Sequence, residues 1–136
     1  MQAKDYMSRV QKAERELHRI SAKKRHYADL AMSIGAKMRA VVVSSNDNSS
    51  KTETAAIGLA EMQEMLEKKE RAYVAIVREA EEKIEQIPQD KFKDVLTYRY
   101  ICGESWPTIR DKLGYKDIKS AHRCNGYALQ ELQKHL

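Results

Sequence analysis

The sequence predicts an all-α protein in which a long antiparallel helical hairpin is followed by a trihelical helix-turn-helix domain. Charged residues make up 33% of the chain and aromatic residues only 7%, with five glycines and two prolines. This composition favours long helices with polar faces over a sheet protein rich in turns. Two long stretches carry apolar residues at helical spacing, and the C-terminal part contains short amphipathic segments separated by glycines.

The first long stretch has apolar or small residues at alternating steps of three and four. Lys24 is the one polar residue at this spacing. The pattern is typical of a helix that packs along another helix. The helix is predicted to end near residues 44–52, because the segment SSNDNSS (residues 44–50) has side chains that bond to the local backbone and favour a loop. The members of this stripe are Val10, Ala13, Leu17, Ile20, Tyr27, Ala31, Ile34, Met38 and Val41.

A second stripe of the same kind ends at Pro88, which disfavours a helical conformation in the residue before it. Residues 1–43 hold ten basic and four acidic residues, whereas residues 44–88 hold six and ten. Opposite charges beside the apolar seam favour a coiled-coil-like antiparallel hairpin over residues 1–88. The members of the second stripe are Leu59, Met62, Leu66, Tyr73, Ile76, Ala80, Ile84 and Ile87.

Two helices bury little apolar surface, so the hairpin is expected to pack on the C-terminal domain or on a second copy of itself as a homodimer. Four methionines, Met32, Met38, Met62 and Met65, are predicted to fill gaps in this packing. The basic run Lys23-Lys24-Arg25-His26 is interpreted as a solvated helix face, with a phosphate-contacting patch as the alternative.

Residues 89–136 are predicted to form three helices. The first covers Gln89 to Tyr100 and is closed by Gly103, which suits the left-handed conformation after a helix end. The second is capped by Ser105, has Pro107 in its first turn and is closed by Gly114. The third is capped by Asp117, and its inner face carries Ala121, Cys124, Ala128 and Leu132.

The outward face of the last predicted helix is basic and hydrogen-bonding, with no acidic residue. A short helix, a glycine-containing turn and such a longer helix form a helix-turn-helix, whose last helix enters the major groove of DNA. Arg123 is the strongest candidate for reading a base, whereas Lys119 and Arg110 suit phosphates. The alternative for each candidate is a solvated surface residue. The predicted DNA-binding residues are Ser105, Arg110, Lys116, Lys119, Ser120, His122, Arg123 and Tyr127.

Residues 95–132 resemble region four of bacterial sigma factors. The matching positions are Leu96, Tyr98-Arg99-Tyr100, Ser105, Ile109, Leu113-Gly114, Ala128-Leu129 and Leu132. The sequence departs from the region-four pattern at two places: Arg110 takes the place of a small residue, and one extra residue follows Gly114 before the recognition helix. A helical leader before such a unit is similar to the small transcriptional regulators of phages and prophages of Gram-positive bacteria, the ArpU and RinA-like group. This resemblance implies DNA binding and gene activation.

The predicted function is sequence-specific binding of double-stranded DNA and regulation of phage or prophage transcription, in the cytoplasm of a bacterial host. Host RNA polymerase is a candidate second partner. One alternative is a DNA-packaging protein resembling a small terminase subunit. The other is a helical interaction module that contacts RNA polymerase without binding DNA.

No enzyme, cofactor or metal site is predicted, since no catalytic constellation is found. Cys102, His122, Cys124 and His135 lack the spacing of a zinc site. Two cysteines without an apolar leader favour a reducing compartment over a disulfide framework. The longest apolar run is Ala40–Val43, so no membrane span is expected.

Overall fold

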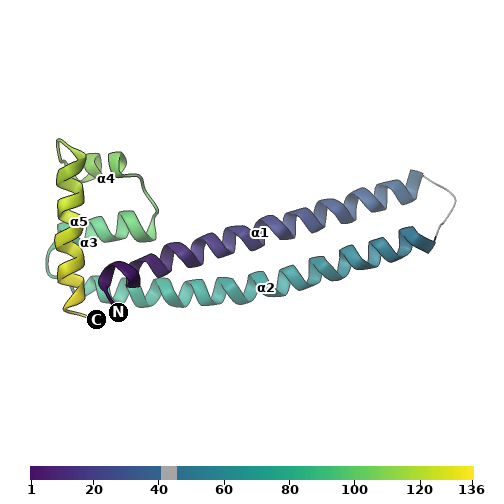
Figure 1. Ribbon diagram of the computed structural model, residues 1–136, viewed down its shortest axis with the longest axis horizontal. Coiled ribbons are helices and arrows are strands. Elements are labelled where there is room, and N and C mark those ends of the chain that lie inside the picture. Colours follow the sequence, from purple (N-terminus) through teal and green to yellow (C-terminus); the bar gives the residue numbers. More distant parts are fainter. Residues whose placement is uncertain (41–45) are drawn as a thin grey trace. The chain divides into compact units, whose positions relative to one another are not determined.

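The computed structural model describes the backbone of residues 1–40 and 46–136, and the side chains of residues 1–33 and 53–136. Its elements are α1 (Ala3–Ala40), α2 (Asn46–Glu85), α3 (Asp90–Leu96), a π-helical turn (Thr97–Ile101), α4 (Trp106–Leu113) and α5 (Ile118–Gln133) (Figure 1). The described residues contain helices and no strand, which confirms the all-α prediction. None of the described helices is long and apolar enough to cross a bilayer.

Packing divides the chain into two compact units. The first consists of Met1–Glu14 and Ala72–Leu136, and the second of Arg15–Arg71. Each long helix therefore contributes residues to both units, and the sequence boundary expected at residue 88 lies inside the first unit. The physical reason is that the first turns of α1 and the last turns of α2 bury side chains in the same core as the C-terminal helices.

Within the second unit, α1 and α2 lie against each other and run in opposite directions. The Tyr27 ring covers Gly58, where an added Cβ would come within 2.7 Å of a ring carbon. Nearer the other end of this unit, Lys69 Nζ lies 3.2 Å from Glu16 Oε2. Residue numbers thus rise on α1 as they fall on α2. The predicted stripes supply buried or half-buried side chains to both helices, including Leu17, Ile20, Tyr27, Leu59, Met62 and Leu66.

The predicted loop is wrong for residues 46–52, because α2 already begins at Asn46. Asn, Asp and Ser favour helix starts as well as loops, since their side chains can accept bonds from the first free N–H groups. Residues 44 and 45 of the predicted loop lie outside the described residues. So do Val41 and the side chains of Ile34 and Met38 from the first stripe.

Two of the four methionines expected in the packing are at the surface. Met32 is 74% exposed and Met65 is 47% exposed, so the prediction that they fill gaps is wrong for both. They lie off the three-and-four stripes, and the helical period turns them away from the seam. Met62, which belongs to a stripe, is half-buried as expected, whereas the Met38 side chain lies outside the described residues.

The core of the first unit gathers side chains from all five helices. The predicted first stripe begins at Val10, but Ala3, Tyr6 and Met7 continue it towards the N-terminus at the same spacing and are buried too. The inner face predicted for α5 is confirmed, since all four of its residues are buried. The buried members of the core are Ala3, Tyr6, Met7, Val10, Ala80, Ile84, Ile87, Val95, Leu96, Tyr100, Ile109, Ala121, Cys124, Ala128 and Leu132.

Two glutamine side chains fix the first turns of α1 in this unit. The Gln133 carboxamide oxygen accepts the Ala3 backbone N–H at 2.7 Å, which gives a partner to an N–H that the helix start leaves free. Gln11 Nε2 donates to the Arg99 carbonyl at 3.2 Å. The start of α1 is thereby tied to the end of α5 and to the segment that follows α3.

The helix predicted over residues 89–100 continues past Leu96 with a wider, π-helical turn. The Cys102 N–H donates to the Thr97 carbonyl at 2.9 Å, five residues earlier. Such turns insert one residue into a helix and occur mostly in single copies. Here the insertion places Tyr100 in the core, while the Arg99 carbonyl receives its bond from Gln11.

Replacing Met7 by Ala is expected to lower the free energy of unfolding by about 2–5 kcal/mol, because Met7 is fully buried and its truncation leaves a cavity. Met32→Ala, on the same helix but exposed, should change it by less than about 0.5 kcal/mol. Urea unfolding followed by circular dichroism measures both. Equal losses in the two variants would mean that the first turns of α1 do not belong to the core.

Candidate nucleic-acid interface

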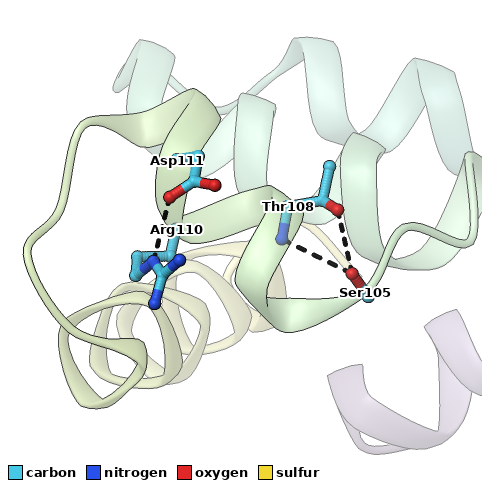
Figure 2. Close-up of polar contacts among 4 residues, drawn as sticks. All are labelled: Ser105, Thr108, Arg110 and Asp111. Carbon is cyan, nitrogen blue, oxygen red and sulfur yellow. Dashed lines mark hydrogen bonds and ion pairs between the residues drawn. The ribbon is translucent and has the colours of Figure 1, made fainter.

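The start of α4 is held by the cap predicted from the sequence. The Ser105 hydroxyl accepts the Thr108 backbone N–H at 3.4 Å and lies 2.9 Å from the Thr108 hydroxyl (Figure 2). Pro107 sits in the first turn, where no intrahelical partner for a backbone N–H is required. At the other end Gly114 has a φ of 77°, the left-handed conformation that glycine adopts without strain. Gly103, before α4, is left-handed as predicted, with a φ of 67°.

The start of α5 is capped by Asp117, again as predicted. Its Oδ1 accepts the Ser120 backbone N–H at 2.8 Å. This bond lowers the pKa of Asp117, and the positive charges of Arg123 and Lys119 lower it further. Residues 114–117 thus connect α4 to α5 in four positions, with a left-handed glycine at one end and a capping carboxylate at the other, which is a length seen in helix-turn-helix motifs.

The outward face of α5 is basic and open to solvent. Lys119, His122, Arg123 and Tyr127 are exposed, and Ser120 is half-buried. No acidic residue occurs between Ile118 and Gln130. The face can therefore offer hydrogen-bond donors and positive charge together, which is the chemistry that phosphates and the acceptor edge of guanine require.

The three remaining candidates lie in or beside the segments that flank α5. Ser105 is exposed at the start of α4, and Lys116 is exposed in the connection between α4 and α5. Arg110 is half-buried, and its Nε lies 3.0 Å from Asp111 Oδ1 (Figure 2). The guanidinium of Arg110 is thus already paired with a carboxylate.

His122 is packed against Trp106 at the first turn of α4. The two ring centroids are 4.1 Å apart and the ring planes are inclined by 38°. The Arg99 guanidinium carbon lies 4.7 Å from the Trp106 ring centroid, and Arg99 Nη1 donates to the Glu104 carbonyl at 3.1 Å. The position of Arg99 over the Trp106 ring suits an attractive cation–π contact. Through His122 and Arg99, Trp106 therefore links α4 to α5 and to the π-helical turn.

A second cation–π contact, between Lys112 and Tyr98, holds the loop before α4. The Lys112 ammonium lies 4.8 Å from the Tyr98 ring centroid and forms an ion pair with Glu104. Its hydrogen bond with Glu104 raises the pKa of Lys112. Tyr98 and Trp106 are half-buried beside the core, and no pattern in the sequence predicts their ring contacts with Lys112, Arg99 and His122.

No metal site is found among the side chains that the structure describes, where no three His, Cys, Asp or Glu side chains are grouped to hold an ion. Cys102 is exposed, whereas Cys124 is buried with its Sγ 3.9 Å from the Lys91 carbonyl. The candidate interface therefore consists of hydrogen-bonding and cationic groups on the outward side of α5.

Asp117→Asn is expected to keep the cap of α5 and to remove its acid sensitivity. The pKa of Asp117 is lowered on folding from its usual 3.8, so the ionised cap adds stability above that pH and loses it as the pH falls through the folded pKa. Asn caps a helix without titrating in this range. Thermal unfolding from about pH 6 to about pH 2 should show a smaller acid loss in this variant. Asp94→Asn, an exposed site outside any cap, is the control, and an identical acid loss in wild type and Asp117→Asn would contradict the prediction.

Trp106→Ala should lower the free energy of unfolding by about 1–3 kcal/mol, because the half-buried ring loses its contacts with His122 and Arg99. Tyr127→Ala removes an aromatic ring that is 53% exposed on α5 and should change it by less than about 0.5 kcal/mol. Urea unfolding of both variants tests the difference. The NMR signals of the His122 ring should also lose the shift caused by the Trp106 ring.

Comparison of the chain with models of protein families, with curated proteins and with solved structures gives no match.

Proposed function

We propose that this protein is a sequence-specific DNA-binding regulator of transcription, of the kind that acts on phage or prophage genes. The observation that carries the proposal is the outward face of α5, which is basic, free of acidic residues and exposed. In this proposal α4, the four-residue connection and α5 act as a helix-turn-helix, and α5 is the recognition helix that enters the major groove.

The side chains on this face differ in what they can recognise. Arg123 is exposed and its charge acts on Asp117, but among the described side chains it forms no ion pair or hydrogen bond with a carboxylate. Its guanidinium is therefore available to bond both acceptors of a guanine. Lys119 and Lys116, near the start of α5, suit the phosphates beside the groove. Arg110 is paired with Asp111, so it can contact a phosphate only if the guanidinium binds both groups at once or leaves Asp111.

The packing of α4 against α5 supports this use, since base contacts demand a fixed recognition helix. Capping by Asp117, the Trp106–His122 contact and the buried inner face of α5 all restrain that helix. In this proposal the packing of His122 on Trp106 helps to position α5, whether or not His122 itself contacts DNA. A regulator built in this way presents a nearly preformed surface and pays little ordering entropy on binding.

The rest of the chain is proposed to form a long antiparallel helical hairpin that precedes the helix-turn-helix domain. The Tyr27–Gly58 and Glu16–Lys69 contacts support the hairpin. The resemblance of residues 95–132 to region four of bacterial sigma factors supports the DNA-binding role. The proposed task of the hairpin is to dimerise the protein or to contact host RNA polymerase.

Selection of bound duplexes from a random pool, followed by anisotropy titration of the recovered site, tests the proposal. Arg123→Ala is expected to weaken binding to the recovered site by about 1–3 kcal/mol and to relax the preference at one base pair. Lys119→Ala should weaken binding to all duplexes and reduce the salt slope by about 1.

Lys134→Ala is the matched control, because it removes one positive charge from the end of α5, where Lys134 is 69% exposed and paired with Glu131. Its binding should stay close to that of the wild type. Failure to recover any consensus, together with no binding at low salt, would exclude sequence-specific DNA binding and leave an interaction module as the better description.

A further inference from the structure

The second compact unit carries a concentrated positive surface that the proposed recognition helix does not use. Arg15, Arg19, Lys23 and His26 follow one another on α1 at steps of four, four and three, which place them on one face of the helix. All four side chains are exposed. His18 and Arg25, also exposed, flank this row. We call these six residues the α1 basic row.

The basic row has no carboxylate partners among the described side chains. No ion pair is formed there by its arginines or by Lys23, although other cations of the long helices are paired, Arg9 with Glu79 at 3.4 Å and Lys69 with Glu16 at 3.2 Å. Within residues 15–26 the one carboxylate is Glu16, which is paired with Lys69 of α2, and the next one, Asp29, follows the row. Uncompensated charges on one face repel each other, so the row has a cost to the free protein that an anionic partner would offset.

The row is also held on a rigid support. On the other side of the same helix Ile20 is buried at 8% exposure, and the Tyr27 ring packs on Gly58 of α2. Arg15 and Lys23 are eight residues apart, about 12 Å along the helix axis. The major groove of DNA is about 12 Å wide, so the Arg15 and Lys23 side chains can reach the phosphates on both of its edges.

We infer that the α1 basic row is a second, sequence-independent contact surface for the phosphate backbone of duplex DNA. The inference extends the proposed function to another part of the chain, but it does not require α5 to read bases. An α-helix laid along phosphates by arginine and lysine adds affinity and salt dependence without adding sequence preference.

Two other partners fit the row less well. A membrane surface would call for bulky apolar side chains among the cations, and between Arg15 and His26 the only apolar residue on this face is Ala22; the exposed Leu30 follows one turn later. A second copy of the chain offers the exposed side of α2, where Glu61, Glu64 and Glu67 are followed by Lys68 and Arg71. The positive charges of Lys68 and Arg71 would repel those of the α1 basic row.

The test compares two double variants of the full chain that each lose two positive charges. Arg19→Gln/Lys23→Gln removes the centre of the row, and Lys68→Gln/Arg71→Gln removes two exposed cations from α2. Glutamine is a good helix former, so both variants should fold, which circular dichroism checks. The probe is a mixed-sequence duplex DNA that lacks the selected site, titrated by anisotropy at salt concentrations from about 50 to 200 mM.

Removal of the two central charges is expected to reduce the slope of log K against log salt concentration by about 1.8, since each phosphate contact contributes about 0.9. The α2 variant should keep the wild-type slope. Equal slopes for the two variants would overturn the inference. Stronger binding of the wild type to phosphatidylserine vesicles than to the duplex would overturn it too, as would dissociation of an oligomer by the Arg19→Gln/Lys23→Gln change in sedimentation experiments.

A third variant, Lys119→Ala/Arg123→Ala, separates this inference from the proposed function. If the basic row binds phosphates, the Arg19→Gln/Lys23→Gln change should still lower the slope when it is combined with this variant. If instead Lys119→Ala/Arg123→Ala leaves binding to the selected site unchanged, the proposed role of α5 fails while the role of the row stands.

Discussion

The burial of one face of α5 is the constraint on which the candidate interface depends. Ala121, Cys124, Ala128 and Leu132 follow each other at steps of three, four and four, and all four are in the core. A helix with 3.6 residues per turn has no rotational freedom left once such a stripe is buried. The packing of these buried residues therefore turns Lys119, Arg123 and Tyr127 outward.

The same core makes the two ends of the chain interdependent. Tyr6, Met7 and Val10 of α1 are buried together with the inner face of α5, and the Ala3 N–H is bonded by Gln133. Helices as short as α3 and α4 are marginal in isolation, so they need a larger apolar surface to pack on. The last turns of α2 and the first turns of α1 provide that surface, which is why these turns belong to the same compact unit as the C-terminal helices.

The cations around α4 have partners that those on α5 and on the middle of α1 lack. Around α4 most cations are paired or lie over rings: Arg110 with Asp111, Lys112 with Glu104 and Tyr98, and Arg99 with Trp106. These contacts join neighbouring elements and so stabilise their arrangement. On α5 and along residues 15–26 of α1 the cations form no ion pair among the described side chains, although Lys119 and Arg123 lower the pKa of Asp117. Positive charge that is not paired within the fold is available for an anion.

The sequence by itself determined the features that depend on neighbours within one helical turn. The caps Ser105 and Asp117, the left-handed Gly103 and Gly114, and the apolar stripes all follow from interactions between residues three or four positions apart. The segment 44–52 shows where local reasoning is ambiguous, because Asn and Ser suit the first turn of a helix as well as a loop. Helix α2 takes residues 46–52 of that segment.

Only the tertiary structure decided the contacts between residues distant in the chain. Gln133 meets Ala3, Gln11 meets Arg99, and His122 meets Trp106, and no periodicity in the sequence pairs these positions. The π-helical turn also involves a distant contact, because its Arg99 carbonyl accepts a hydrogen bond from Gln11 of α1. Sequence patterns report which face of a helix is apolar, but the partner that covers this face is chosen by packing in three dimensions, where shape and hydrogen bonding across the core select among many apolar alternatives.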